Sequence, residues 1–170
     1  MPLPLAMWLT RYRQNPGEAK RAIAHPGLVF VPPPRSEENE HRLKTSSGVG
    51  FNPLAGGEPL VLWVRKEKDN AFQRGITVGR TSNNDLVIDD VSVSRFHAYF
   101  AHDDAAGQWQ LVDAGSKNGT WVKGEKLEAK KPVILGQEAV VRFGDVEVTF
   151  YMPNAFLRLL DTKAKRPSRR

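Results

Sequence analysis

Apolar and β-branched residues recur through the middle of the chain in short runs, and turn-forming residues separate the runs. Nine such runs predict β-strands at residues 60–65, 76–78, 85–88, 96–101, 109–112, 120–122, 133–135, 139–143 and 146–151. The separators, such as Asn118-Gly119 and Gly144-Asp145, are residue types that favour tight turns. Many short strands at nearly regular spacing are typical of a β-sandwich and do not suit an alternating α/β sheet.

The two ends of the chain have a helical pattern. Large side chains recur at positions i, i+3, i+4 and i+7 as Leu5, Trp8, Leu9 and Tyr12. Asn15 followed by Pro16 and Glu18 predicts the start of a second short helix, because these residues suit the N-cap, first and third helical positions. A third helix is expected after Pro153.

These patterns divide the chain into five parts. We expect an N-terminal segment with short helices at 1–31, a linker rich in Pro, Gly and Ser at 32–58, and a β domain at 59–152. A short C-terminal helix at 153–161 and a basic, disordered tail at 162–170 complete the prediction.

The net charge of +6 is unevenly distributed. Residues 60–151 hold twelve basic and thirteen acidic residues, whereas residues 152–170 hold six and one. The β domain is therefore close to neutral, and nucleic acid is not its expected partner, although the basic tail leaves contact with nucleic acid open.

The chain has no cysteine, no secretory signal pattern and no apolar run long enough for a membrane span. A cytoplasmic protein without a membrane partner is expected.

Three separated fragments carry the candidate chemistry: Gly79-Arg80, residues 94–97 (Ser-Arg-Phe-His) and Asn118-Gly119. Their order and spacing resemble the signature of the forkhead-associated (FHA) domain. The resemblance covers roughly 59–152 and implies an all-β fold, an FHA-type β-sandwich of two twisted, mainly antiparallel sheets. The helical N- and C-terminal segments would be extensions of that fold.

The resemblance implies a binding site for a phosphorylated side chain. Arg80 and Ser94 would bind the phosphate oxygens, and Asn118 would hold the ligand backbone. Lys117 would add a positive charge beside the phosphate. Arg95 would either contact the ligand or pair with an acidic neighbour such as Asp89 or Asp90.

Three further positions would support the site without binding the ligand. The resemblance implies that His97 braces the loops through its two ring nitrogens. Gly79 and Gly119 would serve the shape of the backbone.

The implied partner is a protein or peptide that contains phosphothreonine, such as a Ser/Thr kinase or its substrate, and the implied role is that of a signalling adaptor. The chain also offers threonines that a kinase could modify in its own N-terminal segment, Thr10 and Thr45. Thr45 lies in the polar linker, so self-recognition by the β domain is a further hypothesis.

Catalysis is not expected. The sequence has no Gly-x-Ser-x-Gly elbow and no Walker-type phosphate loop, and the four histidines have no spacing that suggests a metal site. We therefore expect no catalytic residue, no metal and no cofactor. The main alternative is a scaffold that keeps the FHA fold but docks an unphosphorylated partner, through the stripe of Leu5, Trp8, Leu9 and Tyr12 or through a face of the sandwich.

Overall fold

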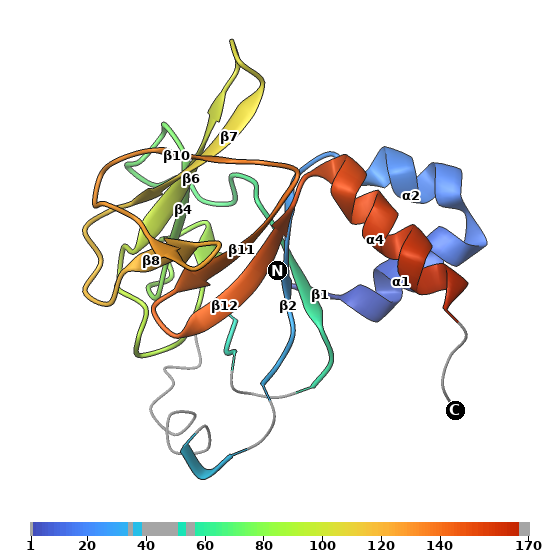
Figure 1. The fold of residues 1–170 in the computed structure, drawn as a ribbon, viewed down its shortest axis with the longest axis horizontal. Coiled ribbons are helices and arrows are strands. Elements are labelled where there is room, and N and C mark those ends of the chain that lie inside the picture. Colours follow the sequence, from blue (N-terminus) through green and yellow to red (C-terminus); the bar gives the residue numbers. More distant parts are fainter. Residues whose placement is uncertain (1, 34–35, 39–50, 54–56, 167–170) are drawn as a thin grey trace.

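Two β-sheets pack face to face in the computed structural model, which describes residues 2–33, 36–38, 51–53 and 57–166 (Figure 1). The larger sheet has the order β1 (Leu3–Pro4), β3 (Leu60–Trp63), β2 (Gly27–Phe30), β12 (Val146–Tyr151), β11 (Glu138–Phe143), β8 (Thr120–Val122) and β9 (Glu125–Lys126). The smaller sheet has the order β10 (Val133–Leu135), β7 (Gln108–Asp113), β6 (Ala98–Asp103), β4 (Ile76–Gly79) and β5 (Leu86–Val87). Neighbouring strands are antiparallel except β4 and β5. The predicted sandwich of two mainly antiparallel sheets is confirmed.

The alternation of apolar residues along the strands forms the core between the sheets. Phe100 from β6 stacks on Phe150 from β12, with 5.9 Å between ring centroids, and both side chains are fully buried. Phe143 from β11 meets Phe100 edge-on. Rings from both sheets therefore interlock, and this packing fixes the sheets against each other.

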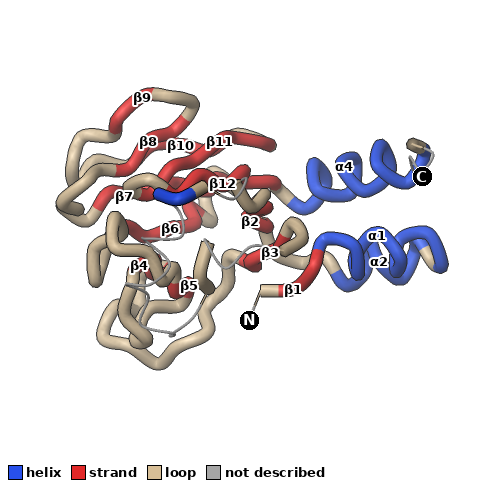
Figure 2. The backbone as a smooth tube through the Cα atoms, turned by 90° about the horizontal axis from the view of Figure 1, so that it is seen from below, coloured by secondary structure: helices blue, strands red, loops and turns tan. Residues whose placement is uncertain are grey.

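Three helices pack on one end of the outer face of the larger sheet: α1 (Leu5–Gln14), α2 (Pro16–Ala22) and α4 (Pro153–Lys165). They lie together at one side of the sandwich, beside the end that contains β1, β2 and β3 (Figure 2). Trp8 of α1 contacts Trp63 of β3 and Phe156 of α4 edge-on, at 5.0 and 6.4 Å between ring centroids. As predicted, the Asn15 side chain accepts a hydrogen bond from the Glu18 N–H and caps α2.

The apolar stripe of the predicted N-terminal helix packs against other elements of the same chain. Leu5 and Trp8 are buried, and they pack with Ile23, Phe156 and Leu160. This packing removes the stripe as the exposed docking surface that a phosphate-independent scaffold would need. The helix instead covers an apolar patch of its own sandwich.

The boundaries of the β domain differ from the expected ones. β2 lies inside the larger sheet, between β3 and β12, so the sandwich includes residues from the expected N-terminal segment 1–31. Most of the expected linker 32–58 lies outside the described residues, but Phe51 pairs with Ile88 in an isolated parallel bridge. α4 continues to Lys165, beyond the expected helix end at 161, and a Lys165–Asp161 ion pair spans its last turn. Residues 162–165, expected at the start of the disordered tail, are therefore part of this helix.

The two-residue strands β1 and β9 were not predicted, since strands this short have no recognisable alternation. They form because they lie beside longer strands, β3 and β8. Of the helices in the described part of the chain, none is long and apolar enough to cross a lipid bilayer.

Candidate functional site

All five residues predicted to contact a ligand line one open hollow of about 390 Å³, namely Arg80, Ser94, Arg95, Lys117 and Asn118. They come from three loops: the loop after β4, the loop before β6 and the loop between β7 and β8. Because β4, β6 and β7 are neighbouring antiparallel strands, the end of β4, the start of β6 and the end of β7 meet at one end of the sheet. The fold thus brings together fragments that are far apart in sequence.

The hollow is cationic within a domain whose net charge is close to zero. Arg80, Arg95 and Lys117 line it, and no acidic side chain does so among the described residues. Apolar and small side chains, including Val91 and Val93, complete its wall. Because the β domain as a whole is nearly neutral, a phosphate site within it needs a local excess of positive charge, and the hollow has one.

Arg80 is anchored at its inner end. Its backbone N–H donates to the Ser94 carbonyl at 3.0 Å, and its Nε donates to the Val93 carbonyl at 3.1 Å. Its side chain makes no other hydrogen bond or ion pair within the described part of the chain. The terminal amino groups of a half-buried, oriented guanidinium are therefore available for an anion.

The Ser94 hydroxyl joins two of the three loops. Its Oγ accepts a hydrogen bond from the Lys117 N–H at 3.0 Å. A hydroxyl that accepts one hydrogen bond still has its own O–H to donate, so Ser94 can offer a proton to a phosphate oxygen. The same contact places the Lys117 backbone beside Ser94.

Asn118 is oriented by a neighbouring loop. Its side-chain amide donates to the Ser92 carbonyl at 2.9 Å. The Ser92 hydroxyl in turn donates to Asp90 at 2.6 Å and accepts from the Asp145 N–H at 2.9 Å. One amide proton and the amide oxygen of Asn118 remain for a ligand backbone, since neither hydrogen-bonds to another described residue.

Arg95 is exposed, and its side chain forms no ion pair with another described residue, Asp89 and Asp90 included. Of the two roles left open by the sequence, contact with a ligand is the one that this geometry supports. The Arg95 backbone has a separate role, because its carbonyl accepts from the Thr81 hydroxyl at 3.0 Å and from the Asn84 amide at 2.7 Å.

His97 is fully buried and hydrogen-bonds to the loop of Ser94 and to the loop between β7 and β8. Its Nδ1 accepts from the Ser94 N–H at 3.0 Å, so its Nε2 carries the proton and donates to the Gly119 carbonyl at 2.9 Å. Burial lowers the pKa of His97, which agrees with a neutral ring, although the Gly119 carbonyl and nearby Asp113 act in the opposite direction. The predicted bracing role is consistent with these contacts.

Gly79 and Gly119 are positions where a side chain would not fit. A Cβ on Gly79 would lie 2.2 Å from the Arg95 carbonyl oxygen and 2.6 Å from the Asn84 amide nitrogen. Gly119 has φ of +84°, a conformation that favours glycine. The close approach at Gly79 allows the end of β4, next to Arg80, to lie against the loop carrying Ser94.

The sequence interpretation missed Asp113, which organises the loop that carries Lys117 and Asn118. Its buried carboxylate accepts from the N–H groups of Gly115 and Ser116 and from the hydroxyls of Ser116 and Thr120, at 2.6–3.0 Å. Burial alone would raise the pKa of Asp113, but these hydrogen bonds outweigh burial and lower it. The signal available in the sequence was an Asp at a strand end followed by a polar, glycine-containing turn.

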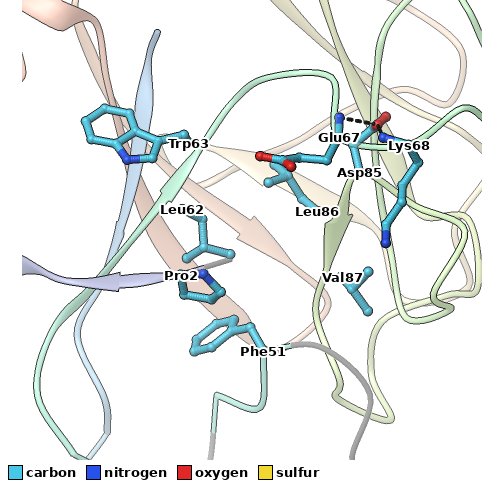
Figure 3. Close-up of a pocket in the computed structure, with 9 residues that line it drawn as sticks. All are labelled: Pro2, Phe51, Leu62, Trp63, Glu67, Lys68, Asp85, Leu86 and Val87. Atoms are coloured by element: carbon cyan, nitrogen blue, oxygen red, sulfur yellow. Dashed lines mark hydrogen bonds between the residues drawn. The ribbon is translucent and has the colours of Figure 1, made fainter. Parts of the chain in front are cut away.

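A second pocket, of about 410 Å³, lies between the open edges of the two sheets (Figure 3). It is lined mainly by apolar side chains, including Phe51, Leu62 and Leu86. Asp85 at its rim accepts from the N–H groups of Glu67 and Lys68. None of the predicted site residues lines this pocket, and no group of three or more His, Cys, Asp or Glu side chains in the described ranges could hold a metal ion.

Comparison with known proteins agrees with this geometry. The model of the FHA domain family matches residues 76–144. The chain is 36% identical over 112 residues to the oxoglutarate dehydrogenase inhibitor of Corynebacterium diphtheriae, covering 62% of this chain and 73% of that protein. It is also 36% identical over 107 residues to the glycogen accumulation regulator GarA of Mycolicibacterium smegmatis, covering 59% of this chain and 63% of GarA.

Among solved structures, the chain matches the FHA domain of a hypothetical protein of Arabidopsis thaliana, with 25% identity and a TM-score of 0.46. That match covers 75% of this chain and 82% of the Arabidopsis chain. The family match includes all three loops of the hollow, and the inhibitor from Corynebacterium is matched over most of its length. The chain therefore belongs to the FHA domain family.

Proposed function

We propose that this chain is a phosphothreonine-dependent interaction module that acts as an adaptor in Ser/Thr kinase signalling, without catalysis. The observation that carries the proposal is the convergence of Arg80, Ser94, Lys117 and Asn118 on one cationic hollow. Each contributes a donor, and none of these donors is neutralised by an acidic side chain lining the hollow in the described part of the chain.

In the proposed complex, the free amino groups of Arg80 and the Ser94 hydroxyl donate to the phosphate oxygens. Lys117 and Arg95 add positive charge at the rim, and the Asn118 amide contacts the peptide backbone beside the phosphothreonine. A phosphothreonine carries about −1.5 to −2 charges at neutral pH, so the cationic hollow suits it. His97, Gly79, Gly119 and Asp113 hold the loops in position and do not contact the ligand.

The number of donors indicates a moderate affinity. Each hydrogen bond to a charged group contributes roughly 1.5–3 kcal/mol, and three or four of them amount to about 5–12 kcal/mol before ordering costs. A dissociation constant in the micromolar range, within about a factor of ten, is therefore expected.

The decisive experiment is a titration of the protein with three matched peptide pools that carry phosphothreonine, phosphoserine or unmodified threonine at one fixed position. We expect binding to the phosphothreonine pool and loss of most of that binding in Arg80→Ala. Arg80→Lys provides a second variant, because it keeps the charge but loses the planar fork and the Nε contact with Val93. Equal binding of all three pools would overturn the proposal.

The relatives suggest how such binding is used. Their names describe an inhibitor of oxoglutarate dehydrogenase and a regulator of glycogen accumulation, which are roles carried out on other proteins or processes. We propose that this chain also acts by binding a phosphorylated protein and that it does so in the cytoplasm, where Ser/Thr kinases and their substrates meet. Co-purification of partners from a lysate, with and without phosphatase treatment, tests whether capture depends on phosphate.

A phosphothreonine within the chain itself is a second source of ligand. Thr45 lies outside the described residues, but it is six residues before Phe51, which pairs with β5 next to the loop of Ser94. Six residues of extended chain span at most about 22 Å, which limits the distance between Thr45 and Phe51. Thr10 lies inside helix α1, so it would have to leave the helix to bind as an extended segment. We therefore propose Thr45 as the internal ligand in preference to Thr10.

Mass spectrometry after treatment with a threonine kinase tests this internal ligand. We expect modification at Thr45 and, in the modified protein, weaker binding of an added phosphothreonine peptide. Thr45→Ala is the matched control and should keep its peptide affinity after the same treatment. Absence of any modification in residues 1–59 would contradict the proposal.

A further inference from the structure

A cation–aromatic stack of Trp121, Arg142 and Lys126 lies on the outer face of the larger sheet. Trp121 in β8 is paired directly with Arg142 in β11 and with Lys126 in β9. The Arg142 guanidinium lies 3.6 Å from the centroid of the Trp121 ring, and the Lys126 amino group lies 5.6 Å from it. Cations are attracted to the face of an indole ring because that face carries partial negative charge. The stack therefore holds the Trp121 ring in a fixed position on a half-exposed surface.

The Trp121 ring packs against the backbone of Gly119, the residue that follows Asn118. A Cβ on Gly119 would lie 2.9 Å from the Trp121 ring, so the ring lies directly against the glycine. The Gly119 carbonyl accepts hydrogen bonds from His97 Nε2 at 2.9 Å and from the Gly144 N–H at 3.0 Å. Gly119 is thus held from several sides, and the backbone next to Asn118 is held with it.

The turn between β11 and β12 contacts a second support of Asn118. A Cβ on Gly144 would lie 2.4 Å from the Ser92 carbonyl oxygen, which is the acceptor of the Asn118 amide. The N–H of the next residue, Asp145, donates to the Ser92 hydroxyl at 2.9 Å. The sequence predicted only a tight turn at Gly144-Asp145. In the structure this turn contacts both Ser92 and the Gly119 backbone, and these two positions fix Asn118.

Arg142 connects the stack to this turn. One of its terminal amino groups donates to the Gly144 carbonyl at 2.7 Å, while its guanidinium lies over the Trp121 ring. Its side chain forms no ion pair with another described residue. A planar guanidinium can stack through its face and donate through its edge at the same time. Loss of this group would therefore loosen Trp121 and Gly144 together.

We propose that Arg142 and Trp121 are positioning residues that set the Asn118 amide for contact with the peptide backbone. Neither residue lines the hollow, so they act through Gly119, Gly144 and Ser92 and not by touching the ligand. The inference rests on the proposed function, because it assumes that Asn118 contacts the peptide beside the phosphothreonine. It gives the outer face of the larger sheet a part in binding.

A double-mutant cycle tests whether the two residues act through Asn118. Arg142→Gln removes the cation, and Trp121→Leu removes the ring but keeps an apolar side chain. Each change is made in the wild type and in Asn118→Ala, and fluorescence polarisation measures the affinity for one phosphothreonine peptide. We expect each single variant to bind roughly three- to tenfold more weakly than the wild type, and no more weakly than Asn118→Ala. Combination with Asn118→Ala should cause no further loss, because the contact is already absent.

Lys123→Gln is the matched control. It removes one positive charge from the exposed turn between β8 and β9, close to the stack in the chain but outside it. Its affinity for the peptide should equal that of the wild type. Urea unfolding of every variant shows whether it is folded under the assay conditions. A general loosening of the domain would weaken binding in both backgrounds, so the cycle distinguishes it from positioning.

The outcomes separate this inference from the proposed function. Weaker binding in the single variants that disappears in the Asn118→Ala background supports positioning through Asn118. Unchanged affinity in the single variants, an equal loss in both backgrounds, or the same loss in Lys123→Gln overturns the positioning role and leaves phosphothreonine-dependent binding intact. Binding that does not depend on phosphate, or an Asn118→Ala variant that binds like the wild type, counts against the proposed function itself.

Discussion

The Ser94 hydroxyl accepts a hydrogen bond from the backbone N–H of Lys117 at 3.0 Å, and this contact joins loops that are 23 residues apart in the chain. It also leaves the hydroxyl proton of Ser94 free to donate. Ser94 therefore has a structural role besides the ligand-binding role that we propose for it, and the two can be measured separately.

Replacing Ser94 by alanine should affect both stability and binding. Loss of the loop contact should lower the free energy of unfolding by about 1 kcal/mol. Loss of a donor to a charged phosphate should weaken phosphothreonine-peptide binding roughly tenfold or more. Urea unfolding and isothermal titration calorimetry measure the two effects. Ser82→Ala, at an exposed position of the β4–β5 loop, is the control, and equal affinities of the two variants would contradict the role of Ser94.

Gly79→Ala should disrupt the site because the new side chain would clash with the backbone of the Ser94 loop. The new Cβ would lie 2.2 Å from a backbone oxygen that is held by two hydrogen bonds, so β4 and the Ser94 loop would have to separate. We expect a loss of roughly 1–3 kcal/mol in stability, accompanied by weaker peptide binding. Gly136→Ala is the matched control, because nothing lies within 4 Å of its Cβ position. If both variants unfold at the same urea concentration, the close packing at Gly79 is not important.

The stability of the protein should fall in mild acid because of His97. Burial lowers the pKa of His97 in the folded protein from the ordinary value of 6.5, so below that pH the unfolded chain binds a proton that the folded protein does not. The contribution of neutral His97 to the free energy of unfolding is fully present above pH 6.5 and is lost as the pH falls through the pKa of the folded protein. Between the two pKa values, the free energy of unfolding can fall by about 1.4 kcal/mol per pH unit.

Urea unfolding of the wild type and of His97→Asn between pH 8 and 5 measures this contribution as a difference. The other histidines are common to both proteins and largely cancel. We expect the gap in stability between wild type and variant to narrow as the pH falls below 6.5. A gap that stays constant over this range would show that His97 is not held neutral by the fold.

The N-terminal helix should matter for stability and not for recognition of the phosphate. Trp8 is 5% exposed and packs on Trp63 and Phe156, so Trp8→Ala should cost about 3–5 kcal/mol of stability. Phosphopeptide affinity, measured on the folded variant at low temperature, should stay the same. Met7→Ala, at the adjacent residue with 43% exposure, should change neither quantity. A well-folded Trp8→Ala protein that loses a partner would instead favour the scaffold hypothesis.

The amino-acid sequence by itself determined the strands and the chemistry of the site. Short apolar and β-branched runs between turn residues predicted the longer strands, because such side chains suit a pleated sheet that is buried on one face. Arg80, Ser94 and Asn118 could be singled out because side chains proposed to bind phosphate or peptide backbone directly leave a signature of residue type and order. The capped start of α2 at Asn15 was equally local and equally predictable.

The tertiary structure decided what depends on contacts between distant residues. Only the packed fold places β2 inside the larger sheet, since the pairing of β2 with β3 and β12 joins residues from both ends of the chain. Asp113 gains its role in the same way, by accepting hydrogen bonds from a whole turn. A side chain that acts through its neighbours has no pattern of its own in the sequence, because those neighbours are chosen by folding.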